Sequence, residues 1–93
     1  MSTLHSAVQI SQDVLFRELD GEAVLLHLDT GKYFGLDAVG ARMWALLAQH
    51  GALEPAYRSL LAEYEVAPDV LERDFTAFVD RLAAQQLLAV RDA

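Results

Sequence analysis

Three short apolar segments, each bounded by turn residues, follow one another in the first part of the chain and predict three strands. They cover residues 14–19, 22–28 and 32–36. Asp20-Gly21 joins the first two and favours a tight hairpin turn, because glycine tolerates a positive φ. A second turn is expected around Gly31. The middle segment is apolar on both faces, as expected for the central strand of a three-stranded antiparallel meander, so the first and third strands are edges.

In the rest of the chain, apolar residues recur with the spacing of amphipathic helices and predict three of them. Asp37 caps the first helix, which runs to about Gln49 and ends before Gly51. The second helix begins near Pro55 and the third near Pro68, because proline is favoured in the first turn of a helix. The apolar stripes expected to face the core are Val39, Met43, Leu46 and Leu47, then Leu53, Tyr57, Leu60, Leu61 and Tyr64, and finally Leu71, Phe75, Phe78, Val79 and Leu82.

Strands followed by helices predict an α+β fold. Residues 1–12 are polar apart from Leu4 and the segment 8–10, so we expect a flexible N-terminal arm that can add a short extended segment. Residues 13–93 form the predicted domain. The apolar tail at 87–90 is compatible with one more short strand that packs on the core.

With 93 residues, of which 54% are apolar, the chain suffices for one small domain with a packed core. It has no cysteine, which excludes disulfides and thiolate chemistry. The net charge of −7, from 14 acidic and 7 basic residues, opposes nucleic-acid binding, because phosphate recognition needs clustered Lys and Arg. No segment has the pattern of a secretory signal or approaches the roughly 20 apolar residues of a membrane span. We therefore expect a cytoplasmic protein that does not bind membranes.

The side chains that could carry chemistry are dispersed along the chain. His5, His27 and His50 lie far apart, and none is near a carboxylate in a metal-binding spacing. The serines occur in no nucleophile motif. Carboxylates gather on the third predicted helix, where a solvated face is the simpler interpretation for all of them except Asp74. We therefore expect no catalytic residue, no metal and no cofactor.

The open edge of the third strand is the feature with functional potential. Free N–H and C=O groups along such an edge can pair with an extended peptide. A line of residues on the third helix would complete a groove if it lay next to this strand. The line consists of Val70, Asp74, Ala77 and Arg81. Alternatively, the segment 8–10 covers the edge and the aromatic residues of the strand belong to the core. The residues themselves leave both interpretations open.

Several short motifs follow one another in a characteristic order from about residue 14 onward. The segment 31–37 (GKYFGLD) fits the pattern G-[KR]-Y-[YF]-x-L-[ND], and Gly40 with Trp44 fits the following G-x-x-x-W-x-L-L. The segment 60–66 (LLAEYEV) comes next, and then Asp74 and Phe78 in an acidic helix. In this order and spacing the sequence resembles the PqqD-like family. The resemblance covers almost the whole chain and implies a winged-helix-turn-helix-like fold.

The resemblance also implies a peptide recognition element, which binds the leader of a ribosomally made precursor peptide and presents it to tailoring enzymes. In this family the leader adds to the third strand and lies against the third helix. The apolar run that precedes Lys32 is more similar to the stand-alone lasso-peptide group, whose partner is a separate leader peptidase. The alternatives are a peptide chaperone of the coenzyme PQQ type, which serves a radical SAM enzyme, and, less favoured by the charge, a DNA-binding winged helix.

The expected peptide site combines residues of the third strand and the third helix. The candidates are Lys32, Tyr33, Phe34, Gly35, Leu36, Val70, Leu71, Asp74, Phe75 and Phe78. Because side chains alternate along a strand, only one of Tyr33 and Phe34 can face the helices. Spacing does not decide which one does, nor which of the apolar residues on the helix belong to the core.

Overall fold

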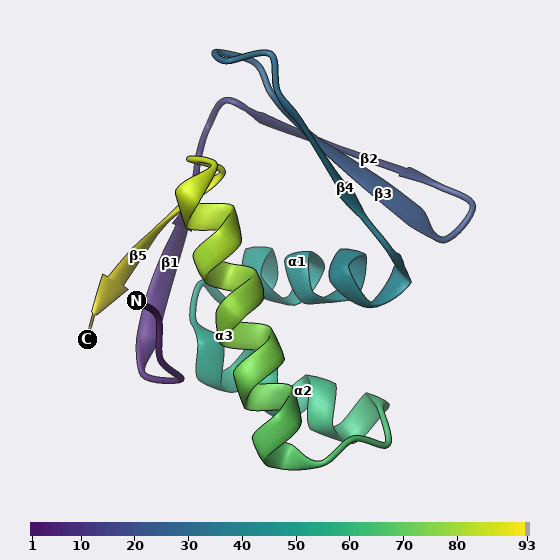
Figure 1. Ribbon diagram of the computed structural model, residues 1–93, viewed down its shortest axis with the longest axis vertical. Helices are drawn as coiled ribbons and strands as arrows, with labels where there is room; N and C mark the ends of the chain where they lie inside the picture. Colours follow the sequence, from purple (N-terminus) through teal and green to yellow (C-terminus); the bar gives the residue numbers. More distant parts are fainter. Residues whose placement is uncertain (93) are drawn as a thin grey trace.

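The computed structural model describes residues 1–92 and has an α+β winged-helix architecture (Figure 1). Three helices pack together, and the sheet β2-β3-β4 projects from them as a wing. The strands are β1 (Ser6–Ile10), β2 (Val14–Leu19), β3 (Glu22–His27), β4 (Tyr33–Leu36) and β5 (Leu88–Asp92), and the helices are α1 (Ala38–His50), α2 (Leu53–Glu63) and α3 (Pro68–Ala84). Within the described residues, none of the helices is both long and apolar enough to cross a membrane.

The predicted meander is confirmed, with antiparallel pairing of β2 with β3 and of β3 with β4. Asp20 and Gly21 both have positive φ, 53° and 82°, as the tight turn between β2 and β3 requires. Leu25 in the middle strand is fully buried, and it lies opposite Phe16 of β2 and Phe34 of β4. Alternate residues of β3 therefore face the helices, and Val24 is on the outer face of the sheet.

The helix boundaries follow from local signals in the sequence. The side chain of Asp37 accepts a hydrogen bond from the N–H of Gly40 at 2.8 Å and so caps α1. The helix ends at Gly51, whose φ of 67° allows its N–H to donate to the carbonyl oxygen of Leu47. Helix α2 begins at Leu53, two residues before the predicted start at Pro55. Pro55 therefore lies in the first turn of the helix, where the N–H that proline lacks would have no partner within the helix.

The core lies between the three helices and the inner face of the wing. Leu46, Leu47, Leu60, Phe75 and Leu82 are among its most buried members. Of the predicted apolar stripes, Tyr57 and Leu61 are partly buried and pack against this core. Val39, 40% exposed, and Tyr64, 36% exposed, lie outside it. Val39 lies at the start of α1 and Tyr64 directly after the end of α2. Each continues the apolar spacing of its helix, but the core does not extend that far.

The N-terminal segment differs from the mobile arm that the sequence suggested. Its short extended segment is strand β1, which pairs with the C-terminal strand β5 in a separate two-stranded sheet. Val8 is buried opposite Val90. The N–H of Ser2 donates to a carboxylate oxygen of Asp80 at 2.7 Å, and the hydroxyl of Ser2 donates to the carbonyl oxygen of Thr76 at 3.0 Å. These contacts hold residues 1–12 against the domain, because β5 supplies a partner about 80 residues away in the sequence that local patterns do not reveal.

Candidate functional site

The outer edge of β4 is free of backbone partners within residues 1–92. The sheet order is β2-β3-β4, so β4 pairs with β3 on one side and has no strand on the other. Strand β1, which could have covered this edge, pairs with β5 instead. In Figure 1 these two strands lie to the left of α3, and β4 lies to its right. The interpretation in which the segment 8–10 covers the edge is therefore wrong.

One hydrogen bond identifies which backbone groups the free edge presents. The N–H of His27 donates to the carbonyl oxygen of Lys32 at 3.0 Å, so these two residues form a hydrogen-bonded pair of the β3–β4 ladder. Such pairs recur at every second residue of an antiparallel ladder, and Phe34 therefore also bonds to β3. The N–H and C=O groups of Tyr33 and Gly35 point away from β3, toward the free edge.

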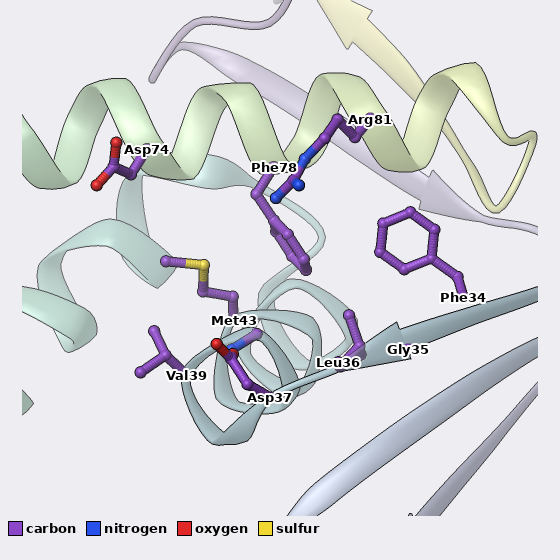
Figure 2. A pocket seen from close by; sticks show the side chains of 10 residues that line it. Phe34, Gly35, Leu36, Asp37, Val39, Met43, Asp74, Phe78 and Arg81 are labelled. Carbon is purple, nitrogen blue, oxygen red and sulfur yellow. The ribbon is translucent and has the colours of Figure 1, made fainter.

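A groove of about 350 Å³ runs beside this edge, between β4, α1 and α3 (Figure 2). It is lined by Phe34, Gly35, Leu36, Asp37, Val39, Gly40, Met43, Asp74, Phe78 and Arg81. Figure 2 shows Asp74, Phe78 and Arg81 on α3 and Phe34 and Leu36 on β4 at opposite walls. The groove thus joins a strand edge that can form hydrogen bonds to a hollow with both apolar and charged side chains, as strand addition requires.

The structure separates the two aromatic residues of β4. Phe34 is half-buried, faces the helices and lines the groove, whereas Tyr33 is 75% exposed on the outer face of the sheet. Half of the predicted set lines the groove, namely Phe34, Gly35, Leu36, Asp74 and Phe78. Lys32, Tyr33, Val70, Leu71 and Phe75 are not among the residues that line it. Leu71 and Phe75 are buried core residues, since they lie on the side of α3 that packs on the domain.

Sequence reasoning missed the contribution of α1. Helix α1 begins directly after β4, so its first turns lie beside the end of the strand. The residues at this end of α1 therefore line the groove, namely Asp37, Val39, Gly40 and Met43. Gly40 allows this close packing: a Cβ atom there would come within 3.3 Å of a carboxylate oxygen of Asp37 and 3.4 Å of Leu36. The absence of any linker between strand and helix was the available signal in the sequence.

Two opposite charges lie along α3 at the groove. The side chain of Asp74 is 61% exposed and lies 3.5 Å from the guanidinium of Arg73. Arg81 is two turns further along α3, and its guanidinium is 5.9 Å from the ring centroid of Phe78, within range of a cation–π contact. The groove therefore has an apolar centre with an acidic residue toward one end and a basic residue toward the other (Figure 2). This arrangement suits an extended peptide with apolar side chains for the centre of the groove and polar groups that fix its direction.

Residues 1–92 contain no cluster of three or more side chains that could hold a metal ion. His27, the buried histidine of the sheet, has a structural contact: its Nδ1 accepts hydrogen bonds from the backbone N–H groups of Asp29 and Thr30. These bonds hold the turn that leads into β4. The imidazole thus positions the strand that presents the free edge.

An open β-edge beside a helix-lined groove is the arrangement of a peptide-binding winged helix, and comparison with known proteins agrees. The sequence profile of the family described as coenzyme PQQ synthesis protein D (PqqD) matches residues 22–88. The chain therefore belongs to the PqqD family, and the predicted resemblance is confirmed. No curated protein matches the sequence.

Two solved structures share the fold. The structure of TbiB1 in complex with the TbiA(beta) leader peptide is 46% identical, covers 87% of this chain and 94% of that one, and has a TM-score of 0.82. The structure of a lasso peptide synthetase B1 complexed with the leader peptide is 24% identical, covers 88% and 96%, and has a TM-score of 0.79. The second similarity supports the fold alone, whereas the first is a relationship across most of both chains.

Proposed function

We propose that this protein is a non-catalytic adaptor that binds the leader of a ribosomally made precursor peptide as an added strand on β4. The observation that carries this proposal is the free edge at Tyr33 and Gly35 beside the groove between β4 and α3. Main-chain pairing with these two residues would supply affinity that does not depend on sequence, and the groove would supply specificity. The 46% identity to TbiB1, whose solved structure contains a leader peptide, supports the same assignment.

A bound leader would alternate its side chains across the edge. Residues opposite Phe34 and Leu36 would point into the groove, because directly opposed residues of neighbouring strands share a face. Asp74 would meet a donor or a basic group of the leader at one end. The leader is disordered before it binds, so ordering it costs about 2–5 kcal/mol. We expect a dissociation constant between about 1 μM and 1 nM, which corresponds to roughly −8 to −12 kcal/mol.

Fluorescence anisotropy with a fluorescein-labelled TbiA(beta) leader peptide tests this proposal. We expect saturable binding in the stated range, and no binding of a scrambled peptide of the same composition. Phe34→Ala should weaken binding, because it removes a large part of the groove wall. Equal affinity for the authentic and the scrambled peptide would overturn the proposal.

The adaptor would act together with a leader peptidase in the cytoplasm, where the precursor is made. A groove that can hold an extended peptide supports a recognition role beside a separate enzyme. In a mixture of the TbiA(beta) precursor and the peptidase that removes its leader, addition of this protein should accelerate cleavage. The same rate with and without the protein would argue against presentation to a peptidase, while leader binding could still hold.

The description of the family favours a second candidate, a peptide chaperone in coenzyme PQQ synthesis that serves a radical SAM enzyme. The precursor peptide of coenzyme PQQ, used as an unlabelled competitor in the anisotropy assay, distinguishes the two. We expect it to displace the TbiA(beta) leader poorly, because the chain is 46% identical to TbiB1. Displacement at lower concentrations than the TbiA(beta) leader itself would support the PQQ assignment.

DNA binding, which other winged helices perform, is disfavoured by the charge of −7 and by the acidic residues of α3. A gel shift with duplex DNA at low salt is the direct test. We expect no retarded band, and a band that disappears steeply as salt is raised would revive this assignment.

A further inference from the structure

Gly35 is a glycine that the fold does not require. Gly21, Gly31 and Gly51 have positive φ, and Gly40 is crowded by its neighbours. Gly35 has neither property: its φ lies outside the left-handed region, and a Cβ atom built there meets no atom within 4 Å. A glycine inside a strand weakens the strand and commonly marks a place where a ligand or another backbone approaches closely.

A side chain at residue 35 would lie on the outer face of the wing. Gly35 is opposite Val24, and Val24 is exposed on the face of the sheet that points away from the helices. A second hollow of about 360 Å³ lies there, formed with Arg17, Leu19 and Glu22. Leu19 is 75% exposed, so its side chain offers apolar surface that nothing in residues 1–92 covers.

The two hollows meet at β4. Gly35, Leu36 and Asp37 line both of them, with the groove on the helix side and the second hollow on the outer side. A strand added at this edge must place one row of side chains on each side. The groove accounts for one row, and the second hollow is positioned to receive the other.

Main-chain pairing selects the guest residue that reaches the second hollow. In an antiparallel guest strand, the outward N–H and C=O groups of Gly35 would bond to the directly opposed guest residue, and opposed residues point to the same face of a sheet. The side chain of that guest residue would therefore pass over the position where Gly35 lacks one. A side chain at residue 35 would occupy the same space.

Building on the proposed function, we propose that Gly35 opens a second specificity subsite on the outer face of the wing for one large, uncharged side chain of the leader. Leu19 and Val24 supply its apolar surface. Arg17 and Glu22 carry opposite charges, and the carboxylate of Asp37 accepts a hydrogen bond from the N–H of Gly40. The apolar side chains of Leu19 and Val24 therefore make this a subsite for an uncharged residue. The leader is thus recognised through both rows of its side chains.

Substitutions of increasing size at residue 35 test the subsite in the anisotropy assay with the TbiA(beta) leader peptide. Gly35→Val should keep or raise the melting temperature, because valine is favoured in strands and has room here. It should weaken leader binding by about tenfold or more, the loss expected when one large apolar side chain is excluded from its site. Gly35→Ala should have a smaller effect. Leu15→Ala, on the outer face of β2 and not among the residues that line the hollow, is the control and should bind as the wild type does.

A glycine scan of the TbiA(beta) leader peptide provides the second measurement and uses the wild-type protein. Loss of affinity at neighbouring positions, rather than at every second position only, is expected if both rows are recognised. The position that lies over Gly35 should matter for the wild type and not for Gly35→Val, which is the signature of direct coupling.

These outcomes separate the inference from the proposed function. If the wild type does not bind the leader, the proposed function fails. If the wild type binds and Phe34→Ala weakens binding, but Gly35→Val binds within about twofold, the second subsite is wrong and the function stands. A scan in which only alternate positions matter would also overturn the subsite, even if Gly35→Val did not fold.

Discussion

The N–H of His27 donates to the carbonyl oxygen of Lys32 at 3.0 Å, and this bond at the start of the β3–β4 ladder decides which backbone groups remain free. Successive residues of an antiparallel strand direct their backbone groups to opposite sides. Phe34 therefore bonds inward to β3, and Tyr33 and Gly35 offer their N–H and C=O groups to a guest.

Hydrogen exchange can test this alternation directly. We expect the amides of Phe34 and Leu36 to be protected in the free protein, and those of Tyr33 and Gly35 to exchange fast. Addition of the leader peptide should slow the exchange of Tyr33 and Gly35, because their N–H groups then gain acceptors. Residue-resolved NMR exchange measures this, and unchanged rates at Tyr33 and Gly35 in the complex would contradict strand addition at β4.

Asp74→Ala should weaken leader binding by about 5- to 30-fold, or ~1–2 kcal/mol, because a carboxylate at the groove loses its hydrogen bond to the guest. The melting temperature should change little, since the side chain of Asp74 is largely exposed. Glu72→Ala is the matched control: it removes the same charge from α3 at a position that does not line the groove. Equal losses in the two variants would mean that net charge, and not a contact of Asp74, affects binding.

Phe75→Ala should lower the free energy of unfolding, whereas substitution of a groove residue should mainly lower the affinity for the leader. Phe75 is fully buried, and truncation of such a side chain lowers the free energy of unfolding by about 3–5 kcal/mol. A domain of this size has a total of roughly 5–14 kcal/mol, so urea unfolding should show a large shift of the midpoint. Phe34→Ala is expected to show the reverse, with a smaller loss of stability and a larger loss of leader binding. Comparable stability losses in both variants would contradict the division between core and groove.

The ion pair between Arg42 of α1 and Glu63 of α2 predicts an acid-dependent contribution to stability. Two hydrogen bonds, of 2.7 and 2.8 Å, join the guanidinium to the carboxylate. Hydrogen bonding to Arg42 lowers the pKa of Glu63 from its usual value near 4.5, and the same bond raises the pKa of Arg42. A carboxyl whose pKa is lower in the folded state stabilises that state above its unfolded pKa, and the benefit is lost as the pH falls through the folded pKa.

We therefore expect Glu63→Gln to melt at a lower temperature than the wild type at pH 7, and the difference to shrink as the pH falls below the usual pKa of about 4.5 and through the lowered pKa of the folded state. It should also shrink in high salt, because the pair is exposed to solvent. Thermal unfolding followed by circular dichroism at several pH values measures this. Glu65→Gln, at a carboxylate for which no ion pair is found in residues 1–92, is the control. A difference that persisted unchanged at pH 3 would show that charge is not its source.

Local signals in the sequence were sufficient to predict the strands and helices of the main sheet and the helical bundle. Asp20-Gly21 specified the first hairpin turn, Asp37 the start of α1 and Gly51 its end, because each acts on backbone groups within a few residues. The apolar spacing of α3 placed Leu71 and Phe75 on one face. It did not show which members of that face border a groove, since helical spacing gives the direction of a side chain and not the element that lies opposite.

Pairing between distant segments needed the tertiary structure. The sequence indicated a short extended segment at residues 8–10 within a flexible arm, but its partner β5 lies at the other end of the chain. The contribution of Val39 and Met43 to the groove likewise depends on the angle at which α1 leaves β4. Such contacts are set by the packing of whole elements, and no periodicity within a single element encodes them.

The order of residues alone determined three hairpin-connected strands, three amphipathic helices, an acidic surface and the family to which the chain belongs, because turn signals and apolar periods act over short distances. The tertiary structure decided that β1 leaves the edge of β4 open, that Phe34 and not Tyr33 faces the helices, and that hollows lie on both sides of Gly35. These features depend on which surfaces the packed core leaves uncovered, and only the assembled fold establishes that.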